Sequence, residues 1–248
     1  MIYVVLPAYN EEEALPPLLE KLAHVRAADI PDMHVIIVND GSADATADVV
    51  SDFSSMHPWV ELANHPQNRG LSQAIQTGLR RALDHAQSGD IIVTMDADNT
   101  QPPQHMLAMR HLIEAQGHDV VVASRFQPGA EVHGVPFMRR LYSRVMSVLF
   151  QTILPIQGIR DYSCGYRAYR METLQEAYDS FGDDFITEEG FACMVEILLQ
   201  VSRLPETRFG EVPLVLRYDL KPTETKMRVT RTIADTLRLA VKHRARSR

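Results

Sequence analysis

The stretch Ile91-Ile92-Val93-Thr94-Met95-Asp96-Ala97-Asp98-Asn99-Thr100 is a short apolar run that ends in two carboxylates one residue apart. A glycine turn precedes the run and two prolines follow it, which predicts a buried parallel strand that delivers Asp96 and Asp98 to the carboxyl edge of a sheet. Ligands of open α/β sheets bind at that edge. Two adjacent anions repel each other, and a hard divalent cation such as Mg²⁺ or Mn²⁺ would neutralise them. The alternative is that Asp98 or Asn99 only caps the next helix.

The composition indicates one soluble domain followed by a basic tail. The chain has 248 residues, of which 45% are hydrophobic and 23% charged, which is ordinary for a globular protein with a full core. A net charge of −7 argues against a general nucleic-acid binder. Residues 226–248 nevertheless contain eight Lys or Arg and one acid. We therefore expect a domain over residues 1–226 and a basic amphipathic helix or tail over 227–248.

Cysteine usage and hydropathy indicate the compartment. Cys164 and Cys193 are too few for a disulfide framework or a four-ligand metal site, so we expect buried thiols in a reducing cytoplasm. The first residues run into an apolar strand without a basic region, which argues against a secretory signal. No apolar run reaches the roughly 18 residues of a spanning helix. We expect a cytoplasmic protein that does not span a membrane by itself.

Apolar runs of strand length alternate with helical runs through the first half of the chain. Strands are expected at 2–6, 34–38, 60–63, 91–95 and 120–123, and helices at 12–26, 44–54, 71–86 and 104–115. This alternation predicts a mostly parallel, doubly wound sheet flanked by helices. The second half is less regular, with expected helices over 139–154 and 187–201 and an apolar strand over 210–217.

Several polar stretches follow the expected strands in a fixed order. They are Pro7-Ala8-Tyr9-Asn10-Glu11, Val38-Asn39-Asp40-Gly41-Ser42 with Asp44 and Thr46, Asp96-Ala97-Asp98, Ser124-Arg125-Phe126 with Arg139 and Ser143, and Cys164-Gly165-Tyr166-Arg167-Ala168-Tyr169. Each alone is explained by turns and helix caps. As an ordered set they resemble the family 2 glycosyltransferases of the GT-A fold, and among these the dolichyl- and polyprenyl-phosphate mannosyl- and glucosyltransferases.

The resemblance implies a role for each matching position. Pro7, Tyr9, Glu11, Asp40, Asp96 and Ala97 would bind the nucleotide, and Asp96 and Asp98 would place Mg²⁺ or Mn²⁺ against its diphosphate. Arg125, Arg139 and Ser143 would hold the phosphate of a lipid acceptor and, with Asp98, form the catalytic set. Arg217 and Lys226 would close over the diphosphate. The family often has a further metal ligand, Gln, where this chain has Thr100 followed by Gln101, so either residue is a candidate.

The implied reaction is the inverting, metal-dependent transfer of a hexose from GDP-mannose or UDP-glucose to a polyprenyl or dolichyl phosphate. A phosphate monoester is largely ionised at neutral pH and attacks without a protein base, whereas a hydroxyl acceptor needs one. Glu188 or Glu189 would be that base in a family 2 enzyme with a saccharide or small-molecule hydroxyl acceptor, or both are simply acids of a first helical turn. A catalytically silent nucleotide-binding protein is a third hypothesis, which the intact Asp96 and Asp98 oppose.

A lipid acceptor requires contact with a membrane, which we expect at the inner face. Residues 229–246 combine apolar side chains with arginines, as in an interfacial amphipathic helix. The same pattern also fits a solvated tail helix docked on the domain, or a short basic segment that follows the end of the fold. If the tail is not the anchor, the apolar helix over 144–154 is the next candidate. A separate membrane protein is a further candidate partner.

Overall fold

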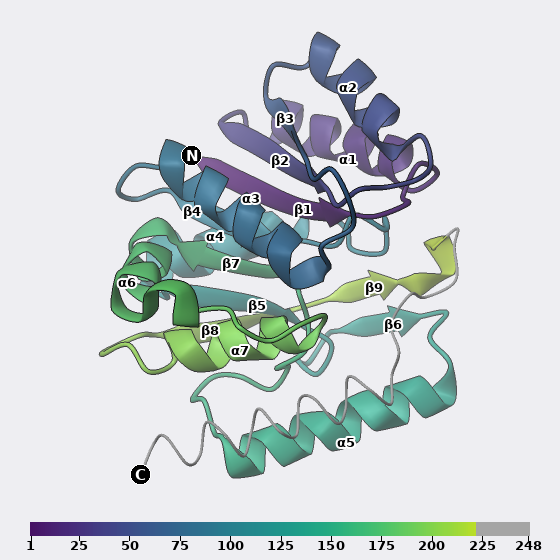
Figure 1. Cartoon of the computed structure of the whole chain (residues 1–248). Coiled ribbons are helices and arrows are strands. Elements are labelled where there is room, and N and C mark those ends of the chain that lie inside the picture. The colour runs from purple at the N-terminus through teal and green to yellow at the C-terminus, as the bar shows by residue number, and fades with distance from the viewer. Residues whose placement is uncertain (222–248) are drawn as a thin grey trace.

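The computed structural model describes residues 1–221. Its centre is a seven-stranded sheet with the strand order β3-β2-β1-β4-β7-β5-β8, and helices pack on both faces of this sheet (Figure 1). Strand β7 runs antiparallel to its neighbours, whereas the other pairs are parallel. The predicted mostly parallel sheet is therefore confirmed. The boundary at residue 226 and the predicted tail helix lie outside the described residues and stay predictions.

The elements follow the predicted alternation through the first half. The strands of the main sheet are β1 (Ile2–Ala8), β2 (Met33–Asn39), β3 (Val60–Asn64), β4 (Ile91–Thr94), β5 (Val120–Ser124), β7 (Arg167–Arg170) and β8 (Phe209–Pro213). The helices are α1 (Leu15–Ala28), α2 (Thr46–Met56), α3 (Leu71–His85), α4 (His105–Gln116), α5 (Phe137–Ile153), α6 (Met171–Phe181) and α7 (Ala192–Val201). Strands β6 (Glu131–His133) and β9 (Val215–Arg217) form a small second sheet, and short turns of 3₁₀-helix follow α6 (Gly182–Asp184) and β9 (Tyr218–Leu220).

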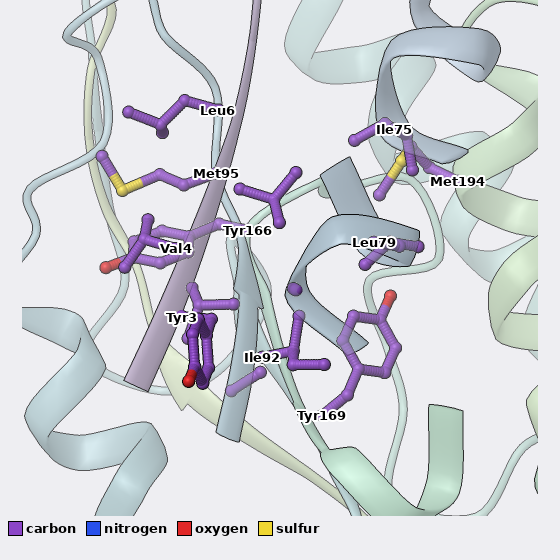
Figure 2. Packing of buried hydrophobic residues seen from close by; sticks show 14 of the residues in the cluster. Tyr3, Val4, Leu6, Ile75, Leu79, Ile92, Met95, Tyr166, Tyr169 and Met194 are labelled. Carbon is purple, nitrogen blue, oxygen red and sulfur yellow. The ribbon is translucent and has the colours of Figure 1, made fainter. Parts of the chain in front are cut away.

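The apolar strands form because both of their faces are covered. Every residue of β4 and β5 is buried, as the continuous apolar runs predict for parallel strands. Figure 2 shows side chains of β1, β4 and α3 packed together with Tyr166, Tyr169 and Met194 from the second half. Helix α3 approaches β1 closely at Gly78, where a Cβ atom would lie 2.2 Å from Cγ1 of Val5. The strand ends at the carboxyl edge are thus held on a rigid support.

Strand β7 is the main element that the sequence pattern does not predict. It lies between β4 and β5, although its sequence is Arg-Ala-Tyr-Arg. Arg167 is completely buried and donates hydrogen bonds to the carbonyls of Tyr162, Cys164 and Met194. Because these carbonyls satisfy the guanidinium, a charged residue is tolerated in the centre of the sheet. The turn before β7 is thereby fixed at the carboxyl ends of β4 and β5.

Two further element predictions are wrong in their boundaries. The helix expected from residue 187 begins only at Ala192, because the buried carboxylate of Glu196 accepts hydrogen bonds from the backbone of Thr187 and Glu188 (2.7 Å each) and holds them in a separate turn. The strand expected over 210–217 divides at buried Leu214 into β8 and β9, which belong to different sheets. Helix α5 then runs along the edge of the molecule beyond β6 and β9 (Figure 1).

Candidate active site

A cavity of about 780 Å³ opens beside the carboxyl ends of β1, β2 and β4. Segments that are far apart in sequence line it, including the turns after these strands, the turn before β7, the inner face of α5 and the end of the described chain. Predicted site residues in its lining are Pro7, Tyr9, Glu11, Asp40, Asp96, Ala97, Asp98, Thr100, Gln101, Arg125, Arg139 and Ser143. The structure therefore brings together the residues that the resemblance assigns to nucleotide, metal and acceptor phosphate.

The turn after β4 holds its two carboxylates by side-chain hydrogen bonds. Gln101 accepts from the Asp96 N–H at 3.0 Å and donates through Nε2 to Oδ2 of Asp96 at 2.6 Å. Thr100 donates to Oδ1 of Asp98 from its backbone N–H (3.2 Å) and its hydroxyl (2.7 Å). Helix α4 begins later, at His105, without a side-chain cap. The alternative that Asp98 or Asn99 only caps this helix is therefore wrong.

The electrostatics of this pair suit a divalent cation. Burial raises the pKa of Asp96 to about 7, repulsion from Asp98 adds to this effect, and the ammonium of Lys221 opposes it. Residues 1–221 contain no group of three or more His, Cys, Asp or Glu placed to hold a metal ion, so Asp96 and Asp98 are the carboxylates that this part of the chain offers. Mg²⁺ is commonly held by one or two carboxylates together with substrate phosphates and water. The oxygen donors present fit that kind of site.

Arg125 is anchored at the rim of the cavity by a buried carboxylate. Its Nε and Nη2 donate to the two oxygens of Asp161 at 2.8 and 2.7 Å, and Nη2 also donates to Ser163 at 2.7 Å. Burial opposes ionisation of Asp161, yet the ion pair with Arg125 and the hydrogen bonds to the carboxylate hold its pKa below the usual value. The guanidinium is thus held rigidly with its charge balanced by Asp161.

The inner face of α5 contributes the second predicted arginine. Nη1 of Arg139 donates to the hydroxyl of Tyr218 at 2.8 Å, and the guanidinium lies 5.1 Å from the centre of that ring. Ser143 lies one helical turn further along, and residues one turn apart share a helix face. Arg140 and Arg144 are exposed at the mouth of the same cavity. The three arginines of this helix could also form a solvated face, and that interpretation does not hold for Arg139, which is half-buried and bonded to Tyr218.

The turns after β1 and β2 are bonded to each other. The backbone N–H of Glu11 donates to Thr46 at 2.8 Å. The carboxylate of Asp40 accepts from the ring of His65 (2.6 Å) and from the backbone N–H groups of Arg69 (2.9 Å) and Gly70 (2.8 Å). Asp40 therefore holds the loop before α3 in place, in addition to lining the cavity.

Comparison with known protein families identifies the family of this chain. The model for glycosyl transferase family 2 matches residues 3–177. The chain is a family 2 glycosyltransferase. This glycosyltransferase is 32% identical over 184 residues to the polyprenol monophosphomannose synthase of Mycolicibacterium smegmatis, a match that covers 72% of this chain and 66% of that enzyme. It is 30% identical over 213 residues to the undecaprenyl-phosphate mannosyltransferase of Micrococcus luteus, covering 86% and 82% of the two chains.

Solved structures confirm the GT-A fold of the glycosyltransferase. One of them is glucosyl-3-phosphoglycerate synthase of Mycobacterium tuberculosis, in complex with Mn²⁺, UDP-glucose and phosphoglyceric acid. It superimposes with a TM-score of 0.70 at 19% sequence identity, and the match covers 99% of this chain and 80% of that one. At this identity the likeness establishes the fold alone.

Some residues assigned to the glycosyltransferase site lie elsewhere. Arg217 is outside the cavity lining, and its guanidinium pairs with Asp219 at 2.8 Å. Glu188 and Glu189 are also outside the lining, whereas Phe191 from the same segment is part of it. The interpretation of both glutamates as first-turn acids of a helix is wrong, because α7 begins at Ala192. Lys226 lies outside the described residues.

Sequence reasoning missed three residues that the structure places in or beside the cavity. Tyr218 contacts Arg139 and Asp161 anchors Arg125, as described above. Lys221 lines the cavity, and its Nζ donates to Oδ2 of Asp98 at 2.6 Å. Asp161 lies three residues before Cys164, in the polar stretch that precedes β7. This proximity to a family-like stretch was the one indication in the sequence that Asp161 belongs to the site. Nothing in the sequence around Lys221 indicates a partner 123 residues away.

Proposed function

We propose that this glycosyltransferase transfers a hexose from a nucleotide diphosphate sugar to a polyprenyl phosphate. The observation that carries the proposal is that one cavity joins the Asp96 and Asp98 carboxylates to the basic inner face of α5. The names of the mycobacterial and micrococcal relatives, which refer to polyprenol and undecaprenyl phosphate, support the same acceptor class. The proposed donor is GDP-mannose or UDP-glucose.

The donor would lie across the carboxyl ends of β1, β2 and β4. Pro7, Tyr9, Glu11, Asp40 and Ala97 would enclose its base and ribose. Mg²⁺ or Mn²⁺ at Asp96 and Asp98 would stabilise the negative charge that grows on the departing diphosphate. Thr100 and Gln101 would act as positioning residues, since their hydrogen bonds fix the two carboxylates. Neither is proposed as a third metal ligand.

The lining also favours a prenyl acceptor over a saccharide. Together with Arg139 and Ser143, the cavity lining contains the apolar side chains of Val132, Val135, Phe137, Leu141, Met146, Phe150, Leu214 and Leu216. A prenyl chain gains free energy from such a surface, whereas sugar hydroxyls lose hydrogen bonds there. Arg139 and Ser143 would hold the acceptor phosphate by charge-assisted hydrogen bonds. Arg125, through its bonds to Asp161 and Ser163, would fix the neighbouring part of the cavity wall.

The phosphate acceptor would attack C1 of the hexose directly. An ionised phosphate oxygen forms the new C1–O bond while the C1–O bond to the nucleotide diphosphate breaks, so the configuration at C1 inverts. Because the attacking oxygen is already ionised near neutral pH, no protein base is needed. This agrees with the position of Glu188 and Glu189 outside the cavity lining.

The decisive experiment supplies the purified chain with Mn²⁺, each of the two donors, and either undecaprenyl phosphate or undecaprenol. We expect hexose in the organic phase with the phosphate and none with the alcohol. The proton NMR spectrum of the product should show the inverted anomeric configuration. Transfer to a sugar hydroxyl, with none to the lipid phosphate, would replace this proposal with the hydroxyl-acceptor hypothesis.

We further propose that α5 meets the inner membrane face as a peripheral contact. No helix among residues 1–221 has the length and apolar character needed to cross a bilayer. Helix α5 exposes an apolar stripe of Phe137, Met138, Leu141, Tyr142, Val145 and Val148, of which Met138, Val145 and Val148 lie outside the cavity lining. Arg140 and Arg144 flank this apolar stripe, an arrangement that suits anionic headgroups. The acceptor phosphate would then enter the cavity beside the same helix.

Val145→Asp should weaken binding to vesicles that contain anionic lipid by about tenfold. Val145 is 56% exposed and outside the cavity lining, and an apolar side chain of this size contributes about 1.5 kcal/mol on leaving water. Met56→Asp is the matched control, because Met56 is 71% exposed at the end of α2. Co-sedimentation measures both variants. If only deletion of residues 238–248 reduces binding, the anchor is the tail and not α5.

A further inference from the structure

We propose that Lys221 is an internal counter-ion of the metal site, which holds Asp98 in the free protein and competes there with the divalent cation. The proposal rests on the metal site assigned above to Asp96 and Asp98. It adds a residue to which neither the family motifs nor the resemblance gives a role. Lys221 would couple loading of the cation to binding of the nucleotide diphosphate.

The contact occupies the oxygen that a cation would need. Oδ1 of Asp98 already accepts two hydrogen bonds from Thr100, and Oδ2 accepts the ammonium of Lys221 at 2.6 Å. The side chains of Asp98 and Lys221 are only 13% and 12% exposed. An ammonium and a divalent cation on the same carboxylate oxygen would be a few ångströms apart, where like charges repel strongly in a partly desolvated site. Lys221 therefore has to leave Oδ2 when the cation arrives.

Other nearby cations have different partners. Among residues 1–221, no other lysine or arginine forms an ion pair with Asp96 or Asp98. Lys21 approaches the same turn, but its Nζ donates to the amide oxygen of Asn99 at 2.6 Å. Arg125 is held by Asp161. Within the described part of the chain, direct competition for Asp98 is therefore specific to Lys221.

Release of Lys221 would leave its charge within the cavity. The residue directly follows the turn Tyr218–Leu220, and its ammonium lies 5.8 Å from the centre of the Tyr218 ring. Its flexible four-carbon stem allows the ammonium to move from Asp98 to a diphosphate bound beside it. The cation and the nucleotide would then each favour binding of the other, because both favour the state in which Lys221 has left Asp98.

Titration with Mn²⁺ alone tests the competition without any turnover. If Lys221 holds Asp98 in about nine-tenths of the molecules, the apparent Kd for Mn²⁺ is raised about tenfold. Lys221→Met should therefore bind Mn²⁺ about tenfold more tightly than the wild-type protein, as measured by the electron paramagnetic resonance signal of free Mn²⁺. Lys21→Met removes an equal charge beside the same turn and should change this Kd by less than about twofold, because it leaves the Lys221 contact intact.

Amine labelling of the wild-type protein provides a second readout that needs no variant. Mn²⁺ should increase acetylation of Lys221, as followed by mass spectrometry of its peptide, while Lys21 remains unchanged. Adding GDP or UDP with Mn²⁺ should protect Lys221 again. An unchanged Kd in Lys221→Met, an equal gain in Lys21→Met, or Mn²⁺-independent labelling of Lys221 would overturn the proposal. None of these results depends on hexose transfer, so the proposed function stands or fails separately.

Discussion

Replacing Asp98 with alanine should lower kcat/KM for hexose transfer by at least ~10³-fold, which corresponds to about 4 kcal/mol of transition-state stabilisation. Asp98 is one of the two carboxylates that the β4 turn presents to the cavity, and its loss leaves a site with a single anionic oxygen donor group. The apparent affinity for a nucleotide diphosphate should fall as well, but only when Mn²⁺ is present. Steady-state kinetics and calorimetric titration with and without Mn²⁺ measure the two effects.

The fold should survive this substitution. Asp98 lies beyond the end of β4, and alanine there removes hydrogen bonds from Thr100 and Lys221 without opening a cavity in the core. We expect a loss of about 1 kcal/mol in the free energy of unfolding, which thermal denaturation would detect. Asp183→Ala is the control, since the Asp183 side chain is fully exposed and pairs only loosely with Arg80 at 3.4 Å. Full activity of Asp98→Ala in Mn²⁺ would refute the metal assignment.

The carboxyl edge could be predicted because its determinants are local in sequence. Each buried parallel strand is an uninterrupted apolar run, and the polar turn that follows it must lie at one edge of the sheet. Asp40 and Asp96 therefore reach the same cavity, as expected. The resemblance assigned Arg139 and Ser143 to the site, and both line the cavity because their spacing of four residues puts them on one face of α5. Their role toward the acceptor phosphate stays a prediction.

The remaining parts depend on contacts between distant segments. Strand β7 was missed because its Arg167 resembles a surface residue, and only the three carbonyls around the folded guanidinium explain its burial. The late start of the predicted helix, at Ala192 instead of residue 187, follows from the carboxylate of Glu196, which accepts hydrogen bonds from the preceding turn. The role assigned to Arg217 came from the resemblance, which does not show that Asp219 pairs with its guanidinium.

Arg139→Ala should reduce kcat/KM for a polyprenyl phosphate by about 10²-fold. A hydrogen bond to a charged group contributes about 1.5–3 kcal/mol, and the guanidinium on the inner face of α5 would make more than one such bond to the acceptor phosphate. The Kd of the nucleotide sugar, measured by calorimetry without acceptor, should change by less than about threefold, because the donor is expected at the β-strand ends. Arg110→Ala controls for the loss of a charge, since Arg110 pairs with Glu114 on the exposed side of α4.

The same measurements decide between the two acceptor classes. If a phosphate attacks, Glu188→Gln and Glu189→Gln should retain activity within about twofold, because no base is required. Tyr218→Phe should give a smaller loss than Arg139→Ala, since it removes one hydrogen bond that orients the guanidinium but keeps the ring beneath it. If a hydroxyl is the acceptor, the glutamate variants should lose more activity than Arg139→Ala. In that case one glutamate variant would abolish turnover while Arg139→Ala remained active, and the turn before α7 would have to move into the cavity for catalysis.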